Sequence, residues 1–412
     1  MQTSLADSIR DTPAGRAADA ILRRCVHCGF CSATCPTYQL LGDELDGPRG
    51  RIYLIKQALE GGAVTDKTRL HLDRCLTCRA CETTCPSGVQ YGRLADIGRQ
   101  FVEQRTKRDL PDRALRAALA LVLPRRALFG ALLALGRLVR PLLPPGLKEK
   151  VPARAAAAGA WPAPRHPRRM LALAGCVQPS LAPSINAAAA RVLDRIGISL
   201  IEAPAAGCCG ALRFHLNRQE AGRDDMRALI DAWWPLVARG EVEAIVMTAS
   251  GCGVMVREYA HHLADDPAYR DKAARVAALS RDLAEVVAAE APALERALGA
   301  GVARGTVAFH APCTLQHGQQ IRGVVEGLLA RTGFELTSVA ESDLCCGSAG
   351  TYSVLQPALS RQLRERKLAA LQSGLPQSLA TANIGCLVHL QAGTETPVRH
   401  WIELLDQALG LG

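Results

Sequence analysis

The chain has 412 residues, with 49 lysines and arginines, 39 aspartates and glutamates and a formal net charge of +10. This length predicts two or three domains, and a content of 49% hydrophobic and 21% charged residues excludes a disordered chain. Residues 105–169 contain 15 of the basic residues and three acidic ones, so the rest of the chain is nearly neutral. This uneven charge argues against broad nucleic-acid binding and favours a local task at a membrane surface or an acidic partner.

The N-terminal residues and the apolar runs are used to predict the cellular compartment. Residues 1–16 are polar and have no apolar stretch of the kind found in secretory signals, and the longest apolar run, residues 127–135, is too short to span a bilayer. We therefore expect a cytoplasmic protein, either free or peripheral on the cytoplasmic face of the inner membrane. Since cytosolic thiols stay reduced, the 16 cysteines are expected to be metal ligands, catalytic thiols or core residues, and not disulfides.

Two cysteine runs near the N-terminus share the spacing C-x2-C-x2-C-x3-C, each followed by proline. They are Cys25, Cys28, Cys31 and Cys35, then Cys75, Cys78, Cys81 and Cys85. In two-cluster ferredoxins the fourth cysteine of such a run ligates the cluster of the other run. The pattern thus predicts one [4Fe–4S] cluster on Cys25, Cys28, Cys31 and Cys85, and a second on Cys75, Cys78, Cys81 and Cys35. Zinc binding and buried thiols are the alternatives, but zinc favours two C-x2-C pairs at a longer separation.

The segment between the two runs indicates the type of ferredoxin. Arg51–Leu59 and Lys67–Leu72 have helical patterns, so we expect an α-helical ferredoxin domain over residues 1–104. His27 lies inside the first run and is interpreted as a surface residue or a neighbour of the cluster. Arg49 and Arg51 are expected either to pair with the charge of a cluster or to lie in a solvated turn.

The second half of the chain is an internal repeat of four cysteines. Its two copies are Cys176, Cys208, Cys209 and Cys252, then Cys313, Cys345, Cys346 and Cys386. In both copies glycine follows the cysteine pair, which would allow a tight turn there.

Each copy alternates predicted strands and helices. The strands 170–176, 199–204 and 244–252 correspond to 306–313, 335–340 and 378–386, and a helix follows each of the first two strands. This alternation predicts one α/β domain with a parallel sheet over residues 170–298 and another over 299–412. The cysteines then fall at the carboxyl ends of strands, where such sheets bind ligands. An iron–sulfur or related redox site is favoured in each copy, with zinc and structural cysteines as alternatives.

These motifs resemble a known family. The Cys-Cys-Gly repeat is similar to the cysteine-rich (CCG) domain of heterodisulfide reductases, of lactate-utilisation proteins and of the anaerobic glycerol-3-phosphate dehydrogenase small subunit. Two ferredoxin motifs followed by two such domains most resemble the glycolate oxidase iron–sulfur subunits, over residues 20–100 and about 170–400.

The resemblance implies a function. FAD-bearing partner subunits would oxidise glycolate to glyoxylate, and this chain would pass the electrons toward membrane quinone without catalytic residues of its own. It also implies one further iron–sulfur cluster in each cysteine-rich domain. The alternatives are a cysteine-rich enzyme that acts directly on a disulfide or quinone, as in the heterodisulfide reductase, lactate or glycerol-3-phosphate systems, and a zinc-stabilised scaffold.

The chain departs from the heterodisulfide reductase pattern at two positions. That pattern ends in C-x2-C and supplies five cysteines, whereas Ala249 and Asn383 stand three residues before the last cysteine here. Four thiolates suit an ordinary cube, or a site with one ligand that is not a thiolate. His310 and His389 lie near these cysteines and are considered as ligands or as core or surface residues.

The basic segment, residues 105–169, has its own pattern. Ala114–Leu143 alternates leucine runs with arginines and is interrupted by Pro124, which predicts two short amphipathic helices. Pro141–Pro167 is interpreted as a linker. Packing on the protein's own domains, a subunit interface and a membrane surface are the three interpretations of the helices.

Overall fold

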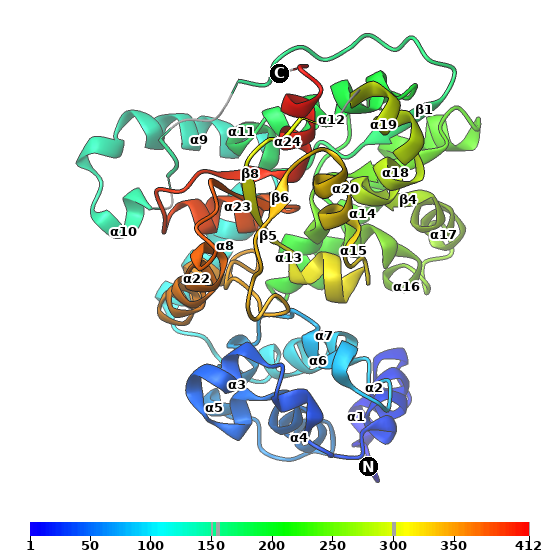
Figure 1. The fold of residues 1–412 in the computed structure, drawn as a ribbon. Helices are drawn as coiled ribbons and strands as arrows, with labels where there is room; N and C mark the ends of the chain where they lie inside the picture. Colours follow the sequence, from blue (N-terminus) through cyan, green and yellow to red (C-terminus); the bar gives the residue numbers. More distant parts are fainter. Residues whose placement is uncertain (150, 154–156, 299–301, 412) are drawn as a thin grey trace.

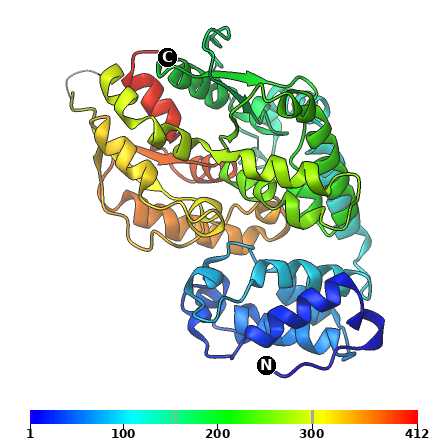
Figure 2. The same ribbon diagram turned by 90° about the vertical axis from the view of Figure 1, so that its right-hand side faces the viewer.

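A computed structural model describes residues 1–149, 151–153, 157–298 and 302–411. The N-terminal region is helical and lies below the rest of the molecule in Figures 1 and 2. Its main elements are α2 (Pro13–Arg24), α3 (Pro36–Leu41), α4 (Pro48–Leu59), α5 (Asp66–Asp73), α6 (Ala80–Thr84) and α7 (Tyr91–Glu103). The helical character predicted for this region is confirmed.

Local sequence explains where these helices begin. The Thr12 side chain accepts a hydrogen bond from Gly15 N at the start of α2, and Thr65 forms a capping box with Thr68 at the start of α5. Helices α4 and α7 pack closely because Gly98 leaves room for Ile55, whose side chain would lie 2.5 Å from an added Cβ. The tight crossing holds the two cysteine runs on a rigid support.

The second half folds into two four-stranded parallel sheets, as the repeat predicts. The strand orders are β2-β1-β3-β4 and β6-β5-β7-β8, so the two copies have the same topology. The strands are β1 (Arg169–Ala172), β2 (Ser199–Glu202), β3 (Ala244–Met247), β4 (Ser280–Asp282), β5 (Thr306–His310), β6 (Glu335–Leu336), β7 (Ser378–Thr381) and β8 (Val398–His400).

The helices of the repeat also correspond. The first sheet carries α12 (Ser184–Arg195), α14 (Gln219–Ala238), α15 (Ser250–Arg257) and α18 (Leu283–Ala289). The second carries α20 (Val324–Arg331), α22 (Pro357–Gln372), α23 (Ile384–Gln391) and α24 (Trp401–Ala408). The predicted multidomain α and α/β fold is therefore confirmed.

Three details differ from the prediction. Cys176 and Cys313 lie four and three residues beyond the ends of β1 and β5, and not on these strands. Cys252 and Cys386 lie in the first turns of α15 and α23 and not at the ends of strands, because β3 and β7 end after four residues. Strands β4 and β8 were not predicted, since three residues are too few to show a period of two.

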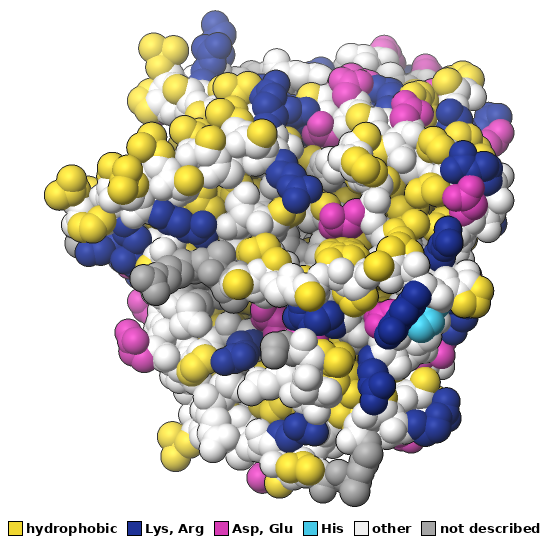
Figure 3. All heavy atoms as spheres, turned by 90° about the horizontal axis from the view of Figure 1, so that it is seen from above, with side chains coloured by type: hydrophobic (Ala, Val, Ile, Leu, Met, Phe, Trp, Pro, Cys, Tyr) yellow, Lys and Arg dark blue, Asp and Glu magenta, His cyan; other side chains and the backbone are white. Residues whose placement is uncertain are grey.

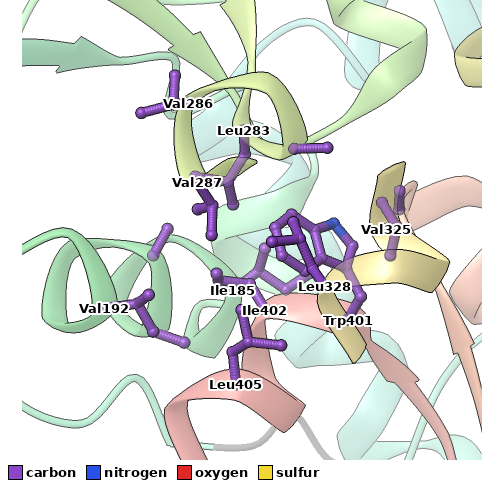
Figure 4. Close-up of a cluster of buried hydrophobic side chains, with 14 of the residues drawn as sticks. Ile185, Val192, Leu283, Val286, Val287, Val325, Leu328, Trp401, Ile402 and Leu405 are labelled. Carbon is purple, nitrogen blue, oxygen red and sulfur yellow. The ribbon is translucent and has the colours of Figure 1, made fainter. Parts of the chain in front are cut away.

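The two α/β halves share one hydrophobic core. Figure 4 shows Ile185 and Val192 of α12 facing Ile402 and Leu405 of α24. Ser184 Oγ also donates a 2.6 Å hydrogen bond to Glu403. The halves are thus fixed relative to each other, which fixes the separation of their cysteines.

The basic segment forms the two predicted helices, α8 (Leu110–Val122) and α9 (Arg126–Leu138), followed by a short 3₁₀ turn and α10 (Pro145–Lys148). Within the described residues no single helix is long and apolar enough to cross a membrane. Helices α8 and α9, which are bent by 112° relative to each other, reach that length and apolar content only when taken together. The predicted domain limits remain a prediction, and the one at 298/299 borders residues outside the described part of the chain.

Candidate iron–sulfur sites

The first group of thiols surrounds a small cavity at the outer end of the helical region. Cys25, Cys28, Cys31 and Cys85 line it, so the last cysteine of the second run joins three of the first run. Burial raises the pKa of Cys31 to about 11, and the neighbouring Cys25 adds to the shift. The lining of this cavity agrees with the crossed arrangement that the spacing predicts, which remains a prediction.

The second group lies inside the helical region, and its Cys78 is also in contact with residues of the second α/β half. Cys35, Cys75, Cys78 and Cys81 line a second cavity, and Cys81 also borders the first one. Burial raises the pKa of both Cys78 and Cys81 well above the ordinary value, and neighbouring thiols add to the effect. The two groups are therefore adjacent, and their cavities share Cys81, Pro48 and Tyr91 as lining residues.

Buried cations surround the second group. Arg51 is 1% exposed, and its guanidinium lies 4.0 Å from Cys35 Sγ while it also contacts Asp46. Arg99 donates a 2.5 Å hydrogen bond to the carbonyl of Cys75. Desolvation opposes ionisation of Cys75, but Arg51 and Arg99 outweigh it and lower the pKa of this thiol. This environment favours an anionic group.

The two arginines in the first turn of α4 have different roles. Arg51 is buried beside the cysteines, whereas Arg49 is 40% exposed and pairs with Glu44 at 2.6 Å. His27 has a left-handed backbone with φ of 55° and lines the first cavity. Burial lowers the pKa of His27, so the ring is neutral at pH 7.

The Cys-Cys-Gly turns are nearly identical in the two α/β halves. Gly210 N donates to Cys208 Sγ at 3.5 Å, and Gly347 N donates to Cys345 Sγ at 3.4 Å. The glycines have φ of 86° and 88°, and an added Cβ would lie 2.4 Å from the Gly222 carbonyl oxygen or 2.6 Å from that of Ser360. Glycine is therefore required here for both its conformation and its size.

All four cysteines converge in each half. In the first half, hydrogen bonds from Cys176 and Cys209 lower the pKa of Cys208, and Cys209 also bonds to Cys252. In the second half Cys313 Sγ lies 3.8 Å from Cys345 Sγ, and the pair continues through Cys346 to Cys386.

The two histidines near the cysteines of the second α/β half differ in their surroundings. His310 lies with Cys346 and Cys386 so that their ligand atoms are all within 4.8 Å of one another. His389 Nε2 instead lies 3.3 Å from Ser360 Oγ and belongs to a hydrogen-bonded pair.

The two positions where the pattern departs from C-x2-C lie close together. Asn383 Nδ2 donates to Cys386 Sγ at 3.6 Å, and its Oδ1 accepts from Gly251 N at 3.3 Å. Ala249 is buried before α15 and has no donor atom. Asn383 therefore connects the neighbourhoods of Cys252 and Cys386.

The helical region contacts the second α/β half through its cysteines. Cys78 and Cys313 pack against the cluster of buried residues that contains Leu76, Cys345 and Tyr352. Tyr352 Oη also donates to the Arg74 carbonyl at 3.1 Å. Sequence analysis missed this junction because its residues are more than 230 positions apart and carry no local signal.

A larger cavity of about 410 Å³ adjoins Cys78 on its other side. Arg79, His261 and His262 are among its lining residues. Burial lowers the pKa of His262 to about 3, so that this ring is neutral. The cavity lies where the helical region meets both α/β halves.

The donor sets fit iron–sulfur clusters chemically. Thiolates are the ligands that such clusters use, and backbone N–H groups that point at sulfur stabilise the anionic form. Each of the four groups supplies four thiols, and Cys75, Cys208 and Cys345 accept backbone N–H bonds.

Comparisons with known proteins agree with this arrangement. Residues 21–89 match the family model of the 4Fe-4S dicluster domain, and residues 170–257 and 307–391 each match the cysteine-rich domain. A lactate utilization protein A of Bacillus cytotoxicus is 25% identical over 56% of this chain and 95% of its own length.

Relatives of full length have the same organisation. The probable glycolate oxidase iron-sulfur subunit of Bacillus subtilis is 29% identical over 94% of both chains. The glycolate oxidase iron-sulfur subunit of Escherichia coli is 57% identical over 99% of both chains. With this identity along its whole length, the chain belongs to the family of glycolate oxidase iron–sulfur subunits.

Proposed function

We propose that this chain is the electron-transfer subunit of a complex that oxidises glycolate to glyoxylate. A partner flavoprotein with FAD would remove the electrons from glycolate, and this chain would carry them toward a membrane quinone. The observation that supports this most directly is the gathering of all 16 cysteines into four groups of four. An iron–sulfur cluster, when bound, accepts and releases one electron at a time.

The ligands and domains proposed are those expected from the sequence. Residues 1–104 would hold two [4Fe–4S] clusters, one on Cys25, Cys28, Cys31 and Cys85 and one on Cys35, Cys75, Cys78 and Cys81. Residues 170–298 and 299–412 would each hold one further cluster on their own four cysteines, and residues 105–169 would be a separate basic segment.

Contacts between the groups support an order for the transfer. The first two groups adjoin at Cys81, and the second group meets Cys313 and Cys345 through Cys78. The last two groups are connected by Asn383, which bonds to Cys386 and to the residue before Cys252. The four sites would thus form a line that ends in the first cysteine-rich domain.

Co-expression with the flavoprotein tests this function. We expect the two proteins to purify together under anaerobic conditions, and glycolate to bleach the visible absorption of the clusters only when the flavoprotein is present. The chain alone, fully loaded with iron, should not respond to glycolate. Bleaching of the chain alone, or failure of the loaded complex to respond, would contradict the proposed role.

The exposed face of the basic segment supports attachment to an anionic lipid surface. Eight leucines of this segment are 36–85% exposed: Leu110, Leu115, Leu121, Leu128, Leu132, Leu135, Leu138 and Leu142. Figure 3 shows hydrophobic side chains projecting beside basic ones along the left edge, where α9 lies in Figure 1. Among the described residues, the exposed Arg113, Arg125 and Arg126 form no ion pair. Leucines flanked by free cations are the pattern of helices that lie on membranes.

Replacing Leu128, Leu132 and Leu135 together by glutamine should weaken sedimentation with phosphatidylglycerol vesicles at least about tenfold, because each buried leucine contributes about 1.5 kcal/mol. Leu375→Gln is the matched control, since Leu375 is 87% exposed but lies outside the segment. Unchanged vesicle binding together with loss of the flavoprotein would assign the face to the partner subunit instead.

A further inference from the structure

His310 is a buried histidine whose polar atoms have no partner in the described part of the chain. Its side chain is 2% exposed, and neither Nδ1 nor Nε2 has a hydrogen-bond partner. Leaving a buried polar group unsatisfied costs about 1–3 kcal/mol, so such a group calls for an explanation. A metal ion bound to the nitrogen lone pair would explain why the side chain lacks a hydrogen-bond partner.

The position of His310 supplies that explanation. The residue ends β5, three positions before Cys313, and its ring nitrogen lies within 4.8 Å of both Cys346 Sγ and Cys386 Sγ. One nitrogen and two sulfur atoms at such separations are a metal-ligand set of a common kind. The second cysteine-rich domain therefore offers five donors, its four cysteines and His310.

The first cysteine-rich domain lacks this feature at the matched position. Leu173 stands three residues before Cys176 and is 4% exposed in the apolar core. The helices beside the Cys-Cys-Gly turns, α14 in the first domain and α22 in the second, also differ at one position. The carbonyl groups of Gly222 and Ser360 lie against Gly210 and Gly347 of the two turns, so these two helix positions correspond. Counted from them, Leu229 in the first domain corresponds to the buried Lys367 in the second. At two positions the first domain thus has leucine, whereas the second domain has a side chain with a nitrogen atom, His310 or Lys367.

Three other side chains near the cysteines of the second α/β half already have partners. Asn383 donates its amide to Cys386 Sγ, so it acts on a ligand and is not one itself. His389 contacts Ser360, and Lys367 Nζ donates to the Glu341 carbonyl. Of these four side chains, His310 is the one whose nitrogen atoms have no partner.

We propose that His310 is a nitrogen ligand of the iron–sulfur cluster in the second cysteine-rich domain, whereas the cluster of the first domain has thiolate ligands alone. The proposal rests on the proposed function in that it requires a cluster in the second domain. The imidazole is a neutral ligand beside the four thiolates, and the buried Lys367 adds a positive charge that raises the reduction potential of such a centre. The two repeated domains would then differ in potential, and the second would hold electrons more strongly.

The test uses the full chain, purified anaerobically and reduced chemically, so that no flavoprotein is needed. Chain containing histidine enriched in the heavy nitrogen isotope is examined by pulsed electron paramagnetic resonance. We expect a strong isotope-dependent nitrogen coupling at one reduced cluster, and its loss in His310→Leu with no loss in His389→Gln. His310→Cys should keep the iron of this cluster and lower its potential.

Several outcomes would overturn the proposal. One is a wild-type chain with iron for a cluster in the second domain but no histidine coupling. The others are a His310→Leu variant with unchanged iron, coupling and potentials, and a chain without iron in the second domain. If His310→Leu does not fold, the labelled wild-type chain decides by itself. A histidine coupling in a chain that does not respond to glycolate and flavoprotein would refute the proposed function while leaving the ligand in place.

Discussion

Replacing Arg51 by methionine should lower the free energy of unfolding of the helical region by about 2–4 kcal/mol, because it removes one of the two arginines paired with the buried Asp46 and leaves two further acceptors without a donor. Arg51 is 1% exposed and contacts the carboxylate of Asp46, which is fully buried. Its Nε also donates to the His71 carbonyl at 2.7 Å, and another nitrogen donates to Thr37 at 3.1 Å. Methionine fills much of the space but offers no donor to these three acceptors.

Arg49→Met is the matched control for this experiment. Arg49 lies on the same helix and pairs with Glu44, but the pair is about 40% exposed. Surface pairs of this kind contribute about 0–1 kcal/mol. Urea unfolding under anaerobic conditions, followed by the loss of visible cluster absorption, should therefore shift strongly for Arg51→Met and little for Arg49→Met. Equal midpoints for the two variants would show that the buried network does not support the cluster region.

Arg49 and Arg51 illustrate which features can be predicted from the sequence and which cannot. Cysteine spacing is local, so the crossed grouping of the first eight cysteines and the repeat of the last eight follow from the sequence. Burial is not local, because Arg51 and Arg49 are equivalent in the sequence and differ through Asp46 and the helices packed around it. His310 is a similar case, since it joins Cys386 only after β5 and β7 pair in the sheet. No spacing rule could reveal that contact.

Helix positions followed from the sequence more closely than strand positions. The predicted helices of the repeat agree with α12, α14, α20 and α22 because their apolar periods extend over several turns. Strands of two to five residues contain too few alternations for their ends to be assigned. The sequence pattern therefore places the last cysteine of each copy on a strand, although it belongs to the helix that follows.

Replacing Cys345 by serine should divide the clusters into two groups that no longer exchange electrons rapidly. Cys345 belongs to the third site of the proposed line, and Cys78 of the second site packs against the cluster of buried residues that contains Cys345. Loss of a thiolate ligand should remove the cluster of the third site. Whichever end receives electrons from the flavoprotein, the sites beyond the gap should then stay oxidised. Rapid freezing during the first turnover with glycolate, followed by electron paramagnetic resonance, measures which clusters are reduced.

Cys208→Ser provides the matched comparison, because Cys208 occupies the same position in the first cysteine-rich domain and accepts the same glycine N–H bond. Its site lies at the end of the proposed line, so its loss leaves the other three sites connected. These three should then be reduced together, or all remain oxidised if electrons enter through the first domain. Quinone reduction by the Cys345→Ser complex should fall to the rate measured without flavoprotein. Uniform reduction of all remaining clusters in Cys345→Ser would show instead that electrons bypass the second cysteine-rich domain, and that the contact between Cys78, Cys313 and Cys345 is structural.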